Sequence, residues 1–197
     1  ADDGSVSIVS AANPDFSLDL SAGQTANQTN VQLYASNGTA AQKYVLEEAA
    51  RPVPDGTYVI LSAKNRNTAL DVQWGSMSDG ANVWLYDVNN TVAQQWRVTN
   101  NADGTLMLVN AKSNKALDIC YGGTASGTNV WQYASNGTTA QRWIPISNAD
   151  GSITLRSASN PKLALDVSAG QAVSGSNIQV YALNGTAAQN FMFKAVN

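Results

Sequence analysis

The chain has 197 residues, of which only 13% are charged, and eleven Lys and Arg against fourteen Asp and Glu give a net charge of -3. There is no cluster of basic residues to hold a phosphate backbone and no apolar run near the roughly 20 residues of a bilayer span, so we expect neither a nucleic acid partner nor a membrane span. The chain has no His and a single cysteine, Cys120, which removes zinc sites, Ser–His–Asp triads and intrachain disulfides, so we expect no metal and no cofactor.

The chain consists of four copies of one unit of about 47 residues. Each copy contains Leu-Asp followed by an aliphatic residue, then at constant offsets a Gly, an Asn, a Tyr, a Gln and finally an aromatic residue two positions after the Gln. The repeated acids are Asp19, Asp71, Asp118 and Asp166. The repeated tyrosines are Tyr34, Tyr86, Tyr133 and Tyr181, and the glutamines are Gln42, Gln94, Gln141 and Gln189. Such agreement indicates that the copies share one local fold.

The second unit shows the expected elements in chain order. Short β-strands separated by Gly, Asn and Ser clusters are predicted at residues 58–61, 69–72, 83–86 and 95–98. In the third of these strands, alternation places Val83 and Leu85 on one face and Trp84 and Tyr86 on the other, so one pair should fill the core and the other face outward. No segment has sustained helical periodicity, so the sequence predicts an all-β fold.

Each third strand ends at an asparagine turn. The turn residues are Asn37, Asn89, Asn136 and Asn184, and Gly follows three of them. Asn-Gly suits the positive φ of a tight hairpin turn. The Asn-x-Thr triplets also match the N-glycosylation signal, but turn chemistry explains their presence in every copy without a glycan.

These motifs resemble those of ricin-B type lectin domains, also called family 13 carbohydrate-binding modules, over essentially the whole chain. The resemblance implies a β-trefoil, in which three four-stranded units surround a pseudo-threefold axis. It also implies sugar sites in which the Asp binds two neighbouring hydroxyls, the Tyr stacks on the sugar ring, and amides near the Gln complete the pocket. The implied site residues are Asp71, Trp84, Tyr86, Asn89 and Gln94 in the second unit, Asp118, Trp131, Tyr133, Asn136 and Gln141 in the third, Asp166, Tyr181, Asn184 and Gln189 in the fourth, and Asp19, Tyr34 and Asn37 in the first.

Two positions depart from the family pattern. Ala41, Ala93, Ala140 and Ala188 precede the repeated glutamines, where members that bind sugar well often carry Asn, so a contact is missing from every site. Trp84 and Trp131 stand where the outer units have Gln32 and Gln179, and we expect these Trp to widen the stacking platform. The glutamines are expected to be mainly structural and only secondary sugar contacts.

Two other interpretations compete with sugar binding. Each Asp could cap the Gly-containing turn that follows it and each Tyr could pack half-buried, which would leave a structural or protein-binding trefoil whose sugar sites have decayed. A glycoside hydrolase needs two carboxylates about 5–10 Å apart, whereas threefold geometry would keep the repeated acids too far from one another. We therefore expect no enzyme, although the chain could be the targeting region of a larger secreted one.

Four units exceed the three that close a trefoil. The interval between the first and second units is the longest and contains two prolines and several charges, so residues 49–56 are predicted to be a linker. Residues 57–197 should form the complete trefoil, and residues 1–48 an orphan unit, the last third of a truncated upstream trefoil. Because one unit cannot bury its own apolar face, we expect self-association through residues 1–48.

Together these features predict a lectin-like module. We expect it to bind galactose-type sugars or a polysaccharide such as xylan through several weak sites that act together. Its location should be extracellular or at the cell surface, because the targets are extracellular glycans.

Overall fold

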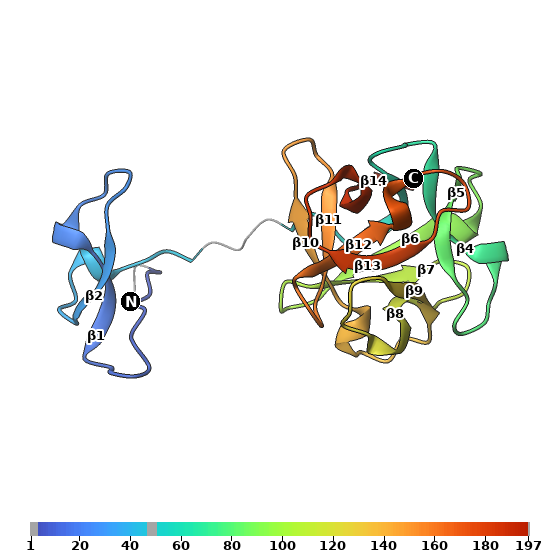
Figure 1. The fold of residues 1–197 in the computed structure, drawn as a ribbon. Helices are drawn as coiled ribbons and strands as arrows, with labels where there is room; N and C mark the ends of the chain where they lie inside the picture. The colour runs from blue at the N-terminus through green and yellow to red at the C-terminus, as the bar shows by residue number, and fades with distance from the viewer. Residues whose placement is uncertain (1–3, 47–50, 197) are drawn as a thin grey trace. The chain divides into compact units, whose positions relative to one another are not determined.

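The computed structural model describes residues 4–46 and 51–196, and the chain divides into two compact units, Ala1–Ala50 and Arg51–Asn197 (Figure 1). Within the described residues every helix is a 3-10 turn of three residues, and the rest of the regular structure is β-strand, as the sequence predicts. No helix in this part of the chain is long enough or apolar enough to cross a membrane.

The larger unit contains three successive groups of four strands. These are β3 (Gly56–Ser62), β4 (Thr68–Val72), β5 (Val83–Asp87) and β6 (Gln95–Asn100), then β7 (Leu106–Asn110), β8 (Ala116–Ile119), β9 (Thr128–Tyr133) and β10 (Trp143–Ser147), then β11 (Ile153–Ser157), β12 (Leu163–Val167), β13 (Ile178–Ala182) and β14 (Phe191–Ala195). The groups coincide with the second, third and fourth sequence units.

The first and last strands of each group form a closed barrel. Around it the antiparallel pairs run β3–β6, β6–β7, β7–β10, β10–β11, β11–β14 and β14–β3. The middle strands form three hairpins, β4–β5, β8–β9 and β12–β13. Each hairpin contacts both of the others, through the β9–β13 pair and through bridges from Asn82 to Trp131 and from Trp84 to Asn177. This is the topology of a β-trefoil.

A ring of three asparagine side chains lies where the hairpins meet. Asn82 Nδ2 donates to Asn177 Oδ1 at 2.9 Å, Asn177 Nδ2 donates to Asn129 Oδ1 at 2.8 Å, and Asn129 Nδ2 donates to Asn82 Oδ1 at 3.0 Å. The three residues occupy the same place in their units, so the ring follows the pseudo-threefold axis. Each amide satisfies one neighbour and is satisfied by the other, which fixes the three hairpins relative to one another.

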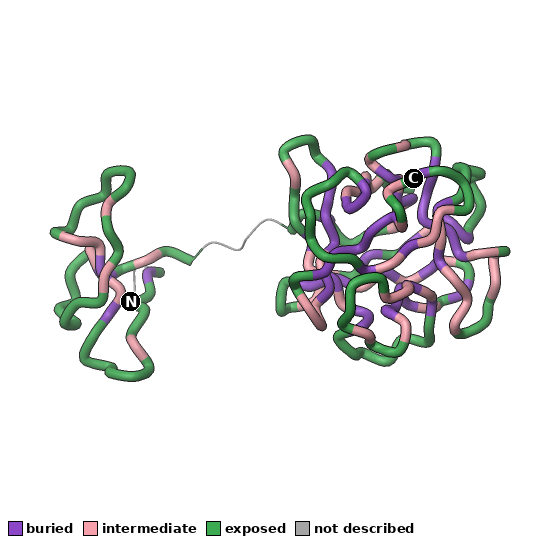
Figure 2. The backbone as a smooth tube through the Cα atoms, viewed as in Figure 1, coloured by how far each residue is buried: buried purple, intermediate pink, exposed green. Residues whose placement is uncertain are grey.

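The core fills the space between barrel and hairpins (Figure 2). Val83 and Leu85 are fully buried while Tyr86 is exposed, which confirms the predicted alternation along β5. The aromatic residues of the Gln-x-aromatic motif are also in the core, as expected: Trp96, Trp143 and Phe191. The indole Nε1 of Trp96 donates to the carbonyl oxygen of Leu70 at 3.1 Å, which satisfies its one polar atom.

The packed trefoil begins before residue 57. Val53 is buried in the core, and its carbonyl oxygen accepts a hydrogen bond of 2.9 Å from Asn100 Nδ2. Asp55 Oδ1 accepts bonds from the backbone and the side chain of Asn100. Residues 53–56 therefore join the trefoil, although the sequence assigned them to the linker, and residues 49 and 50 lie outside the described residues.

The smaller unit has the same hairpin but little of the barrel. β1 (Phe16–Leu20) pairs with β2 (Val31–Ala35), as β4 pairs with β5. Among residues 4–46 the other pairings are two isolated bridges, Val6 to Tyr44 and Val9 to Ser17. Its assignment as the last third of another trefoil stays a prediction.

Candidate functional site

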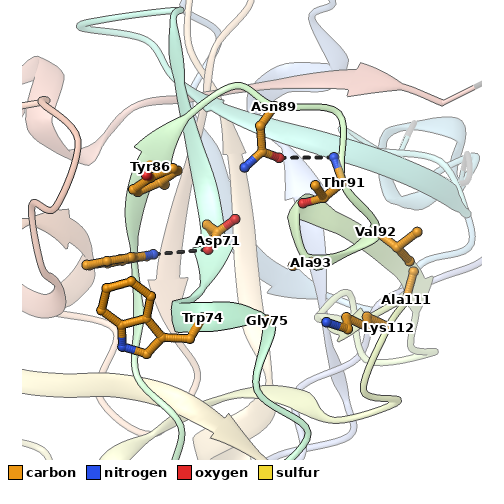
Figure 3. A pocket seen from close by; sticks show the side chains of 11 residues that line it. Asp71, Trp74, Gly75, Tyr86, Asn89, Thr91, Val92, Ala93, Ala111 and Lys112 are labelled. Carbon is orange, nitrogen blue, oxygen red and sulfur yellow. Dashed lines mark hydrogen bonds between the residues drawn. The ribbon is translucent and has the colours of Figure 1, made fainter.

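The predicted site of the second unit is a cavity that surrounds Asp71. Asp71 is the fourth residue of β4, and β5 places Trp84 directly opposite it and Tyr86 two residues further along the same face. The cavity has a volume near 690 Å³. Figure 3 shows Tyr86 and Trp74 on one side of it, Lys112 on the other, and Asp71 between them.

The carboxylate of Asp71 is held by its neighbours and barely exposed. Trp84 Nε1 donates to Asp71 Oδ1 at 3.0 Å, and 5% of the residue is exposed. Burial raises the pKa of Asp71 above its ordinary value, against the opposing effect of hydrogen bonds from Trp84 and Gln94 and the charge of Lys112. The acid lines the cavity, so its remaining lone pairs can accept bonds from a ligand.

A wall of aromatic rings stands beside the acid. Trp84 and Tyr86 stack with ring centroids 5.3 Å apart and planes 19° from parallel, which is consistent with the platform expected of Trp84. Trp74 meets Trp84 with the same centroid separation at an angle of 59°. Trp84 thus has two roles, because its ring extends the wall while its N–H fixes the carboxylate.

The asparagine turn supports the opposite side of the cavity. Asn89 Oδ1 accepts a bond from Thr91 N at 3.0 Å, and the amide nitrogen of its side chain points toward the side of the cavity where Tyr86 lies (Figure 3). The predicted hairpin turn at Asn89 is wrong, because the strands on either side of it, β5 and β6, do not pair with each other. β5 pairs with β4, and β6 pairs with β3 and β7. The chain between them forms η4 (Val92–Gln94). The positive φ is confirmed, at 58° for Asn90.

The repeated glutamines are buried and form hydrogen bonds to the backbone of these turns. Gln94 Oε1 accepts from the backbone N–H of Asn89 at 3.0 Å, and its Nε2 donates to the carbonyl oxygen of Asp87 at 2.9 Å. The same pattern holds for Gln42, Gln141 and Gln189. With both amide atoms bonded inside the protein, the glutamines hold the turn in place and are not exposed to a ligand.

The third unit repeats this arrangement. Asp118 Oδ1 accepts from Trp131 Nε1 at 2.7 Å, and Gln141 Nε2 donates to Asp118 Oδ2 at 2.9 Å. Trp131 and Tyr133 stack with centroids 5.8 Å apart. Asn136 lines the cavity with them, and the cavity volume is near 340 Å³.

The fourth and first units use glutamine in place of the indole. Gln179 Nε2 donates to Asp166 Oδ1 at 2.9 Å in the fourth unit, where Tyr181 and Asn184 are exposed. Burial raises the pKa of Asp166 as it does that of Asp71. In the first unit Gln32 Nε2 donates to Asp19 Oδ1 at 3.1 Å. Asp19, Tyr34 and Asn37 line one cavity there.

In the trefoil, the cavities of Asp71 and Asp118 each include a residue from the unit that follows. Lys112 of the third unit lines the cavity of Asp71, and Ser159 of the fourth unit lines that of Asp118. Lys64 of the second unit donates to the carbonyl oxygen of Gly170, four residues after Asp166 in the chain, at 2.5 Å. These three residues could not be predicted from the sequence, because repeat spacing gives no distances between units. Trp74 and Tyr121 were not predicted either, because the residue before the repeated glycine is aromatic in only two of the four units.

The arrangement combines a carboxylate acceptor, an exposed aromatic face and amide donors, which suits a neutral polyhydroxylated ligand with one apolar face. Within residues 4–46 and 51–196 no three acidic or thiol side chains gather as metal ligands. A comparison with known protein families identifies a family of sugar-binding domains. The model described as "Ricin-type beta-trefoil lectin domain-like" matches residues 40–133 and 92–181, which together cover more than half of the chain.

The chain belongs to the ricin-type β-trefoil lectin family. This confirms the resemblance inferred from the repeated motifs, and it supports a carbohydrate-binding role. Domains of this family are typically non-catalytic.

Solved structures show the same fold. The designed threefold-symmetric protein ThreeFoil is 34% identical with a TM-score of 0.69, and the match covers 72% of this chain and 100% of ThreeFoil. An exo-beta-1,3-galactanase of Clostridium thermocellum, 1,3Gal43A, is 24% identical with a TM-score of 0.68, over 92% of this chain and 38% of that enzyme. The ricin B-like lectin of Macrolepiota procera, in complex with lactose, is 20% identical with a TM-score of 0.60, over 73% and 99%. The last two likenesses show the fold alone. No curated protein matches the chain.

Proposed function

We propose that the trefoil of residues 53–196 binds galactose-type sugars, free or within a polysaccharide, through several weak sites that act together. The observation that carries this proposal is the repeated placement of an acid beside an exposed tyrosine. Asp71 with Tyr86, Asp118 with Tyr133, and Asp166 with Tyr181 each occupy equivalent positions of a hairpin. The alternative explanation, in which each Asp caps the turn after it, fits poorly, since the acids accept bonds from across the hairpin instead.

The physical basis is the two-sided character of a pyranose ring. The carboxylate accepts charge-assisted hydrogen bonds from two neighbouring hydroxyls, while the tyrosine covers the C–H face. In galactose-type sugars an axial hydroxyl leaves one face continuous and apolar, so a flat ring can cover it. The exposed amide of Asn89, and its counterparts Asn136 and Asn184, can donate to the remaining oxygens.

Each site lacks one amide contact, which favours weak binding. Ala93 and Ala140 line their cavities at the positions where an Asn would reach the ligand. Several weak sites on one rigid trefoil gain avidity on a polymer or a glycan-covered surface, where binding at one site raises the local concentration at the next. We place the protein outside the cell for this reason, because polymers of this kind are extracellular.

The relatives are consistent with galactose. The Macrolepiota procera lectin is in complex with lactose, and the Clostridium thermocellum protein is an exo-beta-1,3-galactanase, which would suit a targeting module joined to a glycan-active enzyme. Xylan is the other polymer to test. Isothermal titration with galactose, N-acetylgalactosamine, lactose and xylo-oligosaccharides decides between them, and the absence of heat with all four would remove the proposal.

A structural or protein-binding trefoil is the second candidate, favoured by the alanines before the four glutamines. The two functions separate in one experiment. A variant with Asp71→Asn, Asp118→Asn and Asp166→Asn loses a sugar ligand but keeps a protein ligand bound elsewhere. Retained binding of a protein partner by this variant, with no sugar response from the wild-type chain, would favour the second candidate.

The first unit is proposed to associate with copies of itself. Val31 and Leu33 of β2 are 50% and 59% exposed, whereas their counterparts Val83 and Leu85 are fully buried. In the trefoil, two further units of the same repeat cover that face. Three first units from three chains can cover it in the same way, which would also place a neighbouring unit beside Asp19, as at Asp71 and Asp118.

A further inference from the structure

Two aromatic side chains beside the proposed sugar sites are almost entirely exposed. Trp74 in η3 (Gln73–Gly75) is 82% exposed and Tyr121 in η5 (Cys120–Gly122) is 91% exposed, more than any other large apolar or aromatic residue of the described chain. Both have a left-handed backbone, with φ of 60° and 52°. An aromatic residue in this conformation is both strained and costly to hydrate, so its presence points to a use.

The fold does not require an aromatic residue at this position. Ala22 and Ala169 occupy it in the first and fourth units, in equivalent turns with φ of 54° and 56°. The turn therefore forms around the following glycine whichever residue precedes it. What Trp74 and Tyr121 add is an exposed ring, and that ring is present only in the second and third units.

The added ring continues the aromatic wall of the site. Trp74 lies 5.3 Å from Trp84, which lies 5.3 Å from Tyr86, so three ring centroids follow one another along the cavity of Asp71. In the third unit Tyr121 lies 4.9 Å from Trp131 and continues toward Tyr133. Each step is comparable to the length of one pyranose residue. In the fourth unit, Gln179 replaces the tryptophan opposite the acid and Ala169 replaces the aromatic residue before the glycine. Tyr181 is therefore the one aromatic ring of that wall.

Both added rings line the cavity that surrounds the acid of their own unit. Trp74 lines the cavity of Asp71 and Tyr121 lines that of Asp118, so both rings face the same space as the acids. The cavity of Asp71, near 690 Å³, has room for more than one sugar residue, while that of Asp118 is smaller, near 340 Å³.

We propose that the second and third units each contain a further subsite, in which Trp74 or Tyr121 stacks on the sugar residue next to the one held by the acid. These two sites then recognise internal or disaccharide segments of a chain, whereas the site of Asp166 takes a single terminal residue. The proposal rests on the sugar-binding function proposed above and adds the length of the ligand. The aromatic wall of the second unit, with its larger cavity, gives the stronger dependence on length.

The test isolates the second site by combining Asp19→Asn, Asp118→Asn and Asp166→Asn and uses methyl galactoside, lactose and a β-galactotriose as probes. In this background the site is expected to bind lactose and the triose more tightly than the methyl galactoside. Trp74→Ala should lower the affinity for the two longer ligands by about five- to tenfold, the contribution of one stacked ring. The affinity for methyl galactoside is the internal reference, and thermal unfolding checks that the variant is folded.

The fourth unit provides the reciprocal variant. With Asp19→Asn, Asp71→Asn and Asp118→Asn, only the site of Asp166 remains, and it should bind all three probes alike. Ala169→Trp should then introduce a preference for the longer ligands. Acrylamide quenching gives a second readout, since the triose should protect the exposed indole of Trp74 in the background with the second site and the methyl galactoside should not.

The outcomes separate the two proposals. If the isolated second site binds none of the probes while the wild-type chain binds lactose, sugar binding at this site is refuted and the subsite with it. If the wild-type chain is also silent, the proposed function fails. If it binds methyl galactoside but shows no gain with length, or if Trp74→Ala weakens the three probes equally, the site is a single-residue site and the subsite alone is overturned.

Discussion

The indole nitrogen of Trp84 lies 3.0 Å from Oδ1 of Asp71 and donates a hydrogen bond to it across the hairpin. Gln179 makes the same bond to Asp166 at 2.9 Å, so an indole and an amide serve one purpose at equivalent positions. Because the acid is nearly buried, its orientation depends on this donor. The residue opposite the acid therefore decides how the carboxylate is presented to a ligand.

Replacing Trp84 tests this role. Trp84→Phe keeps a ring but removes the N–H, which leaves a buried carboxylate oxygen without its donor and should lower the free energy of unfolding by about 1–3 kcal/mol. It should also weaken sugar binding at the second site. Trp84→Gln restores the donor found in the fourth unit and should recover the orientation of Asp71. Denaturant unfolding and titration of the isolated second site measure both effects, and equal behaviour of the two variants would contradict the assigned role.

Acidification should weaken sugar binding before it unfolds the protein. Burial raises the pKa of Asp71 and Asp166, and the protonated acid no longer accepts bonds from two hydroxyls. As the pH falls from about 7 toward 4, affinity at these sites should fall at a higher pH than an ordinary aspartate would require. Titration at a series of pH values checks this, and a constant affinity down to the ordinary pKa of aspartate would contradict it.

Protonation of Asp71 and Asp166 should weaken sugar binding but stabilise the folded state. The folded state holds a proton on Asp71 and Asp166 more tightly than the unfolded state, so their contribution to the free energy of unfolding rises as the pH falls through their raised pKa values. Hydrogen bonds from Thr105 and Ser152 lower the pKa of Asp103 and Asp150, so the stability from that pair is lost only below the ordinary range. Binding should therefore be lost while the far-ultraviolet circular dichroism is unchanged.

The asparagine ring predicts a large effect from a small substitution. Asn129→Ala removes one donor to Asn82 and one acceptor from Asn177, which leaves two part-buried amides each with one partner missing, and it should cost about 1–3 kcal/mol of stability. The matched control is Asn30→Ala in the first unit, at the same repeat position but exposed. Denaturant unfolding of the trefoil should detect the first change and not the second, and equal midpoints would show that the ring contributes little.

Self-association through the first unit predicts a defined change in size. The wild-type chain should sediment as a concentration-dependent oligomer, and Leu33→Asp should shift it to the monomer because a charge on the exposed apolar face opposes its burial. Val173→Asp, at an exposed apolar residue of the trefoil, is the control and should leave the distribution unchanged. A wild-type chain that is monomeric at all concentrations would overturn the proposal.

Much of this structure follows from the repeat. The alternation that buries Val83 and Leu85 and exposes Tyr86 is visible in four residues of sequence, because β-strands alternate between faces and the core needs two aliphatic side chains. The burial of Trp96 and Trp143 follows from an aromatic residue that recurs at a fixed offset. The family resemblance then supplied the threefold arrangement, which spacing alone leaves open.

The remainder depends on contacts that spacing does not encode. The Asn-turn motif predicts a hairpin turn at Asn89. In the structure, β5 belongs to a hairpin with β4, whereas β6 belongs to the barrel. The residues between β5 and β6 therefore lead into a 3-10 helix and do not join two paired strands. Lys112 reaches the site of Asp71 from the neighbouring unit, which only closure of the barrel brings near. Trp74 could not be predicted for a different reason. Its position is not aromatic in every copy of the repeat, since the first and fourth units have Ala22 and Ala169 there.

The central claim is that the acids of the three trefoil hairpins hold sugar. Titration of lactose into the wild-type chain, beside the variant with Asp71→Asn, Asp118→Asn and Asp166→Asn, tests it most directly, since Asn keeps the shape of each side chain and removes its charge. We predict measurable heat with the wild-type chain and at least a tenfold loss of affinity in the variant, consistent with the loss of charge-assisted bonds of about 1.5–3 kcal/mol. Equal lactose affinity in the two proteins, with both folded, would contradict the account.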